Sequence, residues 1–259
     1  GVGHFGQIVG IDGGGVFGHL HIGPEATLAR FAAAQADHLD GTIVGLGVGS
    51  KRPTFTFTTA NTATIPVTAD NMSVSNVKFV GNFLSIASCF TVAAAADFVI
   101  DNCDFTDVDA THGFLSIVTT TVTVNADGFT YTNNRRKSDA TTSPGPDIVI
   151  AGTMSRLRVN GNKSIHTVAS NNVAALIEHG ALVMTDAEVI GNIIYSVNTD
   201  TATGAILVKT TATTGSGIIA HNRIRALDIA AAIVVTANAV QYGTFDNLHT
   251  GDVGFSGIV

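Results

Sequence analysis

The chain has 259 residues, of which 45 % are hydrophobic and only 13 % charged, and its formal net charge is −7. Nucleic-acid binding needs clustered Lys and Arg, so this acidic, charge-poor composition argues against it. No apolar run reaches the roughly 20 residues of a membrane-spanning helix, and we expect no membrane partner. Cys89 and Cys103 are too few for a disulfide framework and are expected to be buried thiols.

Residues 1–40 are expected to form an N-terminal arm with a capping helix. The segment GPEATLARFAAAQAD (23–37) carries Pro24 and Glu25 in its first turn, and its larger apolar residues recur on one helical face. A solenoid needs such a cap because an open terminal coil exposes core and unpaired strand edges.

The same arm contains the only histidine spacing that suggests a metal. His19 and His21 alternate along an extended stretch and could chelate an ion, but His4 and His38 are near them only in sequence. The Gly-rich segment 11–18 lacks the Lys-Ser/Thr of a phosphate-binding loop. The sequence therefore predicts neither a metal nor another cofactor.

From residue 41 the sequence repeats with spacings of 25 to 31 residues. One column of the repeat reads Val77, Cys103, Asn134, Asn162, Asn192, Asn222 and Asn247. The columns three and five residues earlier are mostly apolar, which is the alternation of a short strand with one buried face. Asn suits a sharp corner after that strand, because it tolerates left-handed backbone geometry and forms local hydrogen bonds.

A second strand-like run recurs between these corners, and a third short strand is expected just after each Asn. The runs are FLSIA (83–87), FLSIV (114–118), DIVIA (147–151), AALIE (174–178), AILVK (205–209) and AIVVT (232–236). This long period of strands predicts an all-β parallel β-helix over residues 41–259, of about seven to eight coils. A propeller would need about four antiparallel strands per blade, and a sandwich would show repeated hairpin turns.

The Asn corners resemble the internal asparagine ladder of the right-handed parallel β-helix, or pectin-lyase-like, superfamily, over about residues 41–250. The resemblance implies a right-handed coil with a structural ladder of Asn134, Asn162, Asn192, Asn222 and Asn247. Thr/Ala-rich coils such as RPTFTFTTANTATIPVTADN are similar in texture to β-helix proteins of tailed-phage virions. Members of the superfamily either cleave or bind polysaccharides or serve as non-catalytic virion parts, and the fold alone does not choose between these roles.

Catalytic patterns of the superfamily are only fragmentary in this chain. The polygalacturonase pattern NTD, DD, GHG, RIK is matched by Asn198–Asp200 and nearly by Arg223–Arg225, with no DD or GHG between them. A tailspike-like hydrolase would need two carboxylates roughly 5–10 Å apart. Asp109 and Asp139, which follow successive corners, are the candidate pair. Asp is also an ordinary turn residue, and this non-catalytic interpretation is favoured.

The position after the Asn column faces outward and predicts a charge ladder in which Asp104 lies between Lys78 and Arg135. The complete column is Lys78, Asp104, Arg135, Lys163, Ile193, Arg223 and Leu248. Asp107 is expected in the loop that follows. The turn-rich insertion 133–147 is expected to be a contact loop.

Sugar-binding proteins usually present Trp and Tyr platforms. This chain has no Trp and three Tyr, and Tyr131 and Tyr242 fall in inward columns, which leaves only Tyr195 as a platform. Together with the missing catalytic patterns, this scarcity favours a non-enzymatic protein.

The sequence thus predicts a structural protein of a tailed-phage virion: a capsid decoration or cement protein, or a short head spike. We expect it in the virion after assembly in the host cytoplasm, as a homotrimer that contacts the major capsid protein or other virion proteins. The alternative is a tailspike-like or secreted polysaccharide depolymerase, a hydrolase or lyase, on the same fold. A third possibility is a fragment of a surface adhesin, which would be marked by a membrane or cell-wall anchor.

Overall fold

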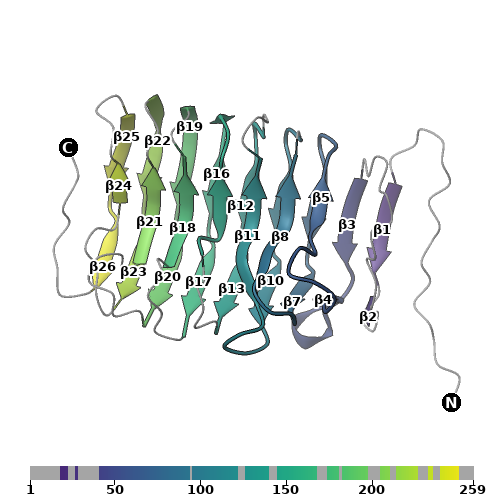
Figure 1. Ribbon diagram of the computed structural model, residues 1–259. Helices are drawn as coiled ribbons and strands as arrows, with labels where there is room; N and C mark the ends of the chain where they lie inside the picture. Colours follow the sequence, from purple (N-terminus) through teal and green to yellow (C-terminus); the bar gives the residue numbers. More distant parts are fainter. Residues whose placement is uncertain are drawn as a thin grey trace, which may run out of the picture.

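The protein is an all-β parallel β-solenoid whose three sheets run along the stack (Figure 1). The computed structural model describes residues 18–22, 27–28, 41–93, 95–121, 126–139, 145–167, 174–180, 183–197, 205–210, 214–226, 233–235 and 240–250. Within these ranges every ladder between named strands is parallel, and the helical structure is a single short 3-10 turn, η1 (Gly49–Lys51). The parallel β-helix predicted from the repeat is therefore confirmed.

The three sheets are named A, B and C. Sheet A contains β1 (Gly18–Ile22), β3 (Gly41–Gly45), β6 (Ser73–Ser75), β9 (Val99–Asp101), β12 (Thr130–Thr132), β15 (Met154–Ser155), β16 (Arg158–Asn160), β19 (Val183–Ile190), β22 (Thr214–Ala220) and β25 (Val240–Phe245). Sheet B contains β2 (Thr27–Leu28), β4 (Thr54–Phe57), β7 (Lys78–Gly81), β10 (Asp104–Asp107), β13 (Arg135–Ser138), β17 (Lys163–His166), β20 (Ile193–Ser196), β23 (Arg223–Ala226) and β26 (Leu248–Thr250). Sheet C contains β5 (Ile65–Val67), β8 (Ile86–Val92), β11 (Phe114–Thr120), β14 (Ile148–Ile150), β18 (Ala174–His179), β21 (Ala205–Thr210) and β24 (Ile233–Val235).

The register of sheet A follows the repeat found in the sequence. The inward column predicted three residues before the Asn column is paired, strand by strand, through Val74, Ile100, Tyr131, Val159, Val189, Ile219 and Thr244. All of these except Thr244 are buried. The register holds because a slip of one residue would turn every apolar side chain outward.

The capping helix predicted over 23–37 is wrong at Thr27–Leu28, because these two residues form strand β2, which pairs with β4. No α-helix occurs among the described residues, and the rest of 23–37 lies outside them. β1 likewise pairs with β3, so sheets A and B both continue across residue 41. Strands satisfy the free N–H and C=O groups of a sheet edge directly, which a helix laid over that edge could not do.

In sheet C the similar runs read from the sequence are in register at only one step, where Ala174 of AALIE pairs with Ala205 of AILVK. The other steps are offset. Phe114 pairs with Ile86 and Val118 with Phe90, so FLSIV does not stand above FLSIA, which starts three residues earlier. Inward positions require only apolar side chains, so similar letters in the two segments were a poor guide to register.

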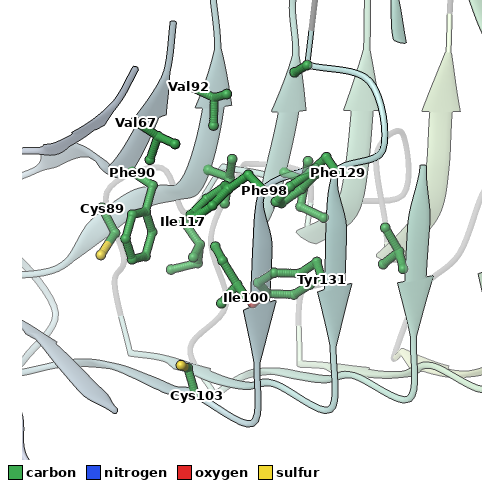
Figure 2. Close-up of a cluster of buried hydrophobic side chains, with 14 of the residues drawn as sticks. Val67, Cys89, Phe90, Val92, Phe98, Ile100, Cys103, Ile117, Phe129 and Tyr131 are labelled. Atoms are coloured by element: carbon green, nitrogen blue, oxygen red, sulfur yellow. The ribbon is translucent and has the colours of Figure 1, made fainter. Parts of the chain in front are cut away.

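Stacked rings fill the interior of the N-terminal half of the solenoid. In sheet B, Phe55 stacks on Phe79 and Phe79 on Phe105, with ring centroids 5.5 and 5.2 Å apart. In the turn that leads into sheet A, Phe98 and Phe129 lie in consecutive coils, 5.8 Å apart, and Figure 2 shows them side by side. Each residue of the repeat thus meets its equivalent one coil away, at close to the strand spacing of about 4.8 Å.

Cys89 and Cys103 are buried free thiols, as expected (Figure 2). Burial raises the pKa of the Cys103 thiol to about 12, although a hydrogen bond from the Val77 backbone opposes it. The pKa of Cys89 is raised as well, by burial and by the neighbouring Cys103. Neither thiol forms the thiolate that cysteine reactivity requires.

The corner between sheets A and B is built on hydrogen bonds between successive Asn residues. Asn192 illustrates the pattern: its Oδ1 accepts the Asn162 N–H at 3.0 Å, and its Nδ2 donates to the Val159 carbonyl at 2.7 Å. The same two bonds recur along the ladder of Asn134, Asn162, Asn192, Asn222 and Asn247. This side-chain ladder satisfies backbone groups that the corner would otherwise leave buried and unpaired.

The left-handed residue of each corner is not the ladder Asn, as we had expected, but its predecessor. Positive φ angles occur at Asn76, Asn102, Asn133, Gly161, Gly191, His221 and Asp246. The two roles differ because a side chain that bonds to the coils on both sides must point inward, while the turn itself needs only a permissive backbone.

Candidate functional site

Asp109, one of the two candidate catalytic carboxylates, closes its own turn in the loop after β10. Its Oδ1 accepts the N–H groups of Thr111 and His112, both at 2.8 Å, and Oδ2 lies 2.9 Å from His112 Nδ1. The backbone hydrogen bonds of Thr111 and His112 hold the pKa of Asp109 well below its usual range. A carboxyl group that stays ionised cannot donate a proton to a leaving group near neutral pH.

Asp139, the other candidate, lies just after β13 and contacts the coil that follows. It accepts a hydrogen bond from Lys137 Nζ at 2.6 Å and one from the Thr167 hydroxyl. Burial tends to raise the pKa of Asp139, but these hydrogen bonds outweigh burial and leave the pKa below its usual value.

The two carboxylates are therefore turned towards different partners. Asp109 bonds within its own turn, whereas Asp139 bonds to Lys137 and, one coil further on, to Thr167. No hydrogen bond joins Asp109 to Asp139 in the described part of the chain.

Asp107 lies inside the solenoid and not in the following loop, where we had expected it. It is the last residue of β10, is 4 % exposed, and accepts hydrogen bonds from the Phe114 N–H at 3.0 Å and the Ser138 hydroxyl at 2.7 Å. Burial raises its pKa against the opposing charge of Arg136. Its position makes it part of the core.

Arg136 is the centre of a buried polar network that sequence reasoning missed. Its side chain is 1 % exposed, and its Nη1 donates to Asp147 Oδ1 at 2.8 Å and to the Gly145 carbonyl at 3.0 Å. Nη2 donates to the Phe114 carbonyl at 2.9 Å. Desolvation tends to lower the pKa of Arg136, but the charges of Asp147 and Asp107 together outweigh it, so the pKa is raised and the guanidinium stays charged. The 133–147 insertion was expected to be a contact loop. The ion pair of Arg136 with Asp147 holds both ends of this insertion against the core.

His166 completes this network in a neutral state. Ser164 donates its hydroxyl to Asp147 at 3.0 Å, so the Ser164 oxygen accepts from His166 Nε2, 3.1 Å away. Nδ1 is then an unprotonated acceptor, and it has no partner among the described residues. Burial, with the charge of Arg136, lowers the pKa of His166 to about 3. The buried, neutral imidazole is thus part of the packed core.

The outer face of sheet B carries the charge column read from the sequence, with one change. Asp104 stands between Lys78 and Arg135 in the register, as predicted. The cation that reaches it is instead Arg52, whose Nη1 lies 3.1 Å from Asp104 Oδ2. Neither of its two strand neighbours forms an ion pair with Asp104 among the described residues.

The other end of this face forms the groove that we take as the candidate functional site. It is a hollow of about 420 Å³ over the adjacent strands β17, β20, β23 and β26 (Figure 1). Its outward-facing residues are Lys163, Ile165, Ile193, Tyr195, Arg223, Arg225 and Leu248. Arg225 lies over the Tyr195 ring, with Cζ 5.4 Å from the ring centroid, which is cation–π geometry. Tyr195, the platform predicted from the sequence, is therefore the aromatic centre of a cationic groove.

The remaining sequence candidates cannot be placed in a site from the described residues. His19 and His21 belong to β1, whose side chains lie outside the description, as do residues 198–200. Within the described ranges, no three His, Cys, Asp or Glu side chains gather closely enough to hold a metal. No helix in these ranges could cross a bilayer.

No protein-family model matches this sequence, and a search of curated proteins found no match. Two solved structures of PfbA, a surface adhesin of Streptococcus pneumoniae, are similar in backbone arrangement. One is 12 % identical with a TM-score of 0.37 and covers 81 % of this chain and 69 % of the adhesin. The other is 11 % identical with a TM-score of 0.29 and covers 82 % and 74 %. At this level the likeness places neither a family nor a function on the chain.

Proposed function

We propose that the protein is a non-enzymatic structural component of a tailed-phage virion, a right-handed β-helix that decorates or cements the capsid or forms a short spike. The observation that carries the proposal is the continuous, filled and hydrogen-bonded stack. Sheet B alone runs through nine strands without interruption. Such a stack supplies stiffness and resistance to unfolding, which a protein on the surface of a particle needs.

The side chains considered for catalysis support the same proposal. Asp109 and Asp139 are held as carboxylates by separate local partners, and neither offers the raised pKa of a general acid. Asp107 and His166, which do have perturbed pKa values, are sealed in the core. The depolymerase alternative therefore has no specific observation in its favour.

The proposal is tested by asking whether this chain is a stoichiometric part of an intact particle. Particles from the producing cells would be purified on a density gradient, and the chain would be counted by quantitative mass spectrometry against the major capsid protein. We expect a fixed copy number in multiples of three that survives repeated gradients. Recovery only in the soluble or cell-envelope fraction would overturn the proposal.

A further inference from the structure

The outer face of sheet B changes character at the groove over β17, β20, β23 and β26. In the earlier coils the column after the Asn ladder holds the charged residues Lys78 and Asp104. In the groove the same column includes Ile193 and Leu248, whose side chains are 40 % and 57 % exposed, and Tyr195 lies beside them. Bulky apolar side chains grouped on the surface mark a site that another molecule covers.

Three exposed cations, Lys163, Arg223 and Arg225, border these apolar side chains. None of them forms an ion pair among the described residues, but neither do Lys78 and Arg135, so this alone does not distinguish them. Their grouping does, because all three line one hollow whose lining residues include no Asp or Glu. A basic hollow with an apolar floor favours a ligand that brings carboxylates and apolar side chains together.

We propose that this groove binds an acidic, amphipathic α-helix of a partner protein. Lys163 and Arg223 stand in one outward column with Ile193 between them, so they are about 9.6 Å apart along the stack. In an α-helix, residues i and i+7 lie on one face, about 10.5 Å apart along the axis. A helix parallel to the stack therefore places two carboxylates, seven residues apart, opposite these two cations.

The apolar side chains of the groove fit the same helix. Along the column they alternate with the cations in the order Lys163, Ile193, Arg223, Leu248. The four strands span about 14 Å, the length of about ten helical residues. Helices bind in such grooves through apolar residues at i, i+3, i+4 and i+7, and this stripe meets Ile193, Tyr195 and Leu248.

Two other occupants fit the groove less well. A second copy of the chain, related by a two-fold axis, would bring the same three cations face to face, which is repulsive. A bilayer of anionic lipids would satisfy the charges, but binding to it requires apolar side chains that protrude, whereas these line a hollow. The proposal is independent of the structural role in the particle, and its failure would leave that role untouched.

The experiment measures, by fluorescence anisotropy, how tightly the 259-residue protein binds a labelled acidic peptide of about 20 residues, long enough to be helical alone when rich in Ala. Leu residues follow one face of the peptide, and Glu residues seven positions apart flank that face. A basic counterpart has Lys in place of every Glu, and a scrambled counterpart has no apolar face. We expect the acidic helix to bind and both counterparts to bind about tenfold more weakly.

Matched variants locate the site. Tyr195→Ala should weaken binding of the acidic helix about tenfold and Lys163→Ala about threefold. Lys78→Ala should bind as the parent does, because Lys78 stands in the same outward column but outside the groove. The double variant Lys163→Glu/Arg223→Glu should reverse the preference and bind the basic helix more tightly than the acidic one, a result that loss of folding could not produce.

Four results would overturn the proposal. The acidic helix binds no better than its counterparts, or the charge-reversed protein still prefers it. Lys78→Ala weakens binding as much as Lys163→Ala does, which would mean diffuse charge and no site. Vesicles of phosphatidylglycerol displace the acidic helix and sediment with the protein, which would make the groove a lipid site. Tyr195→Ala dissociates an oligomer of the parent in sedimentation velocity, which would mean that another copy of the chain covers the groove.

Discussion

The inward column of sheet B changes from aromatic to polar side chains and back to the apolar Ile194 and Ile224 along the stack. In the N-terminal coils it is a stack of rings, Phe55, Phe79 and Phe105, whereas in the next two coils the same positions hold Arg136 and Ser164. The strands keep the same register through the change. The backbone ladder therefore tolerates either chemistry. In the polar coils Arg136 and Asp147 pair with each other and Ser164 bonds to Asp147, whereas Arg136 Nε and His166 Nδ1 have no hydrogen-bond partner among the described residues.

The same substitution, to Met, should have very different effects on stability at a polar and at an aromatic position of this column. Arg136→Met is expected to lower the free energy of unfolding by about 3–5 kcal/mol, since Asp147 would be left as a buried, uncompensated charge. Phe105→Met, one coil away, should cost less than about 1.5 kcal/mol, because it is an apolar exchange of similar volume. Denaturant unfolding of the two variants measures the difference.

The double variant Arg136→Met/Asp147→Leu separates the charge from the packing. If the cost of Arg136→Met is the stranded charge, the double variant should recover a large part of the lost stability. Equal losses in the single and double variants would contradict the account.

The asparagine ladder should be the next most sensitive feature. Asn192→Ala removes the partners of the Asn162 N–H and the Val159 carbonyl, both inside the corner, and should cost about 3 kcal/mol. Asn247→Ala, at the partly exposed end of the ladder, is the control and should cost clearly less. Equal losses would mean that the ladder is not the source of the corner's stability.

His166 should make the stability of the buried polar network around Arg136 sensitive to acid. Its pKa is lowered by burial from 6.5 to about 3 in the folded protein, so the unfolded chain binds the proton more readily. Stability is therefore complete above pH 6.5 and falls as the pH drops towards 3. Between pH 6.5 and pH 5 the expected loss is about 2 kcal/mol.

His166→Gln should remove this part of the pH dependence. The raised pKa of Asp107 acts in the opposite direction, since its protonation favours the folded state as the pH falls, but it is common to both proteins and cancels in the difference. Parallel stability curves for parent and variant between pH 6.5 and 5 would contradict the assignment of the shift to His166.

The smallest effect is expected at the surface. Arg156 and Asp97 form an ion pair at 3.0 Å with side chains 52 % and 45 % exposed, so Arg156→Gln should cost less than about 1 kcal/mol. Unfolding measured at low and high salt should show the parent approaching the variant as salt increases. If Arg156→Gln lowers the free energy of unfolding as much as Arg136→Met does, burial does not determine how much an ion pair contributes to the stability of this solenoid.

The sequence contained most of the fold because the solenoid repeats itself. The inward columns of sheet A and the position of the Asn ladder followed from spacing alone, since each coil reuses one strand geometry. The left-handed residues were assigned one position too late, because backbone and side-chain roles of adjacent residues look alike in a sequence. The helix over 23–37 was mispredicted because pairing with β4, a tertiary effect, overrides local helical periodicity at Thr27–Leu28.

Only some residues of the candidate site could be predicted from the sequence. Tyr195 could be singled out because so few aromatic platforms exist, and the outward column named Lys163 and Arg223, but nothing in the sequence joined them into a groove. Arg136 could have been placed inside by strand alternation, since Arg135 was already assigned outward. Its pairing with Asp147 could not, because the connecting loop has no repeat to fix its path.

The central proposal is that this solenoid is a structural protein and not a polysaccharide depolymerase. The most direct test is the average chain length of alginate, and of a panel of bacterial capsular polysaccharides, after prolonged incubation with the purified protein. The account predicts no shortening by size-exclusion chromatography with light scattering. If the polymers are shortened by the parent protein but not by Asp109→Ala or Asp139→Ala, the account is contradicted and the depolymerase alternative is supported.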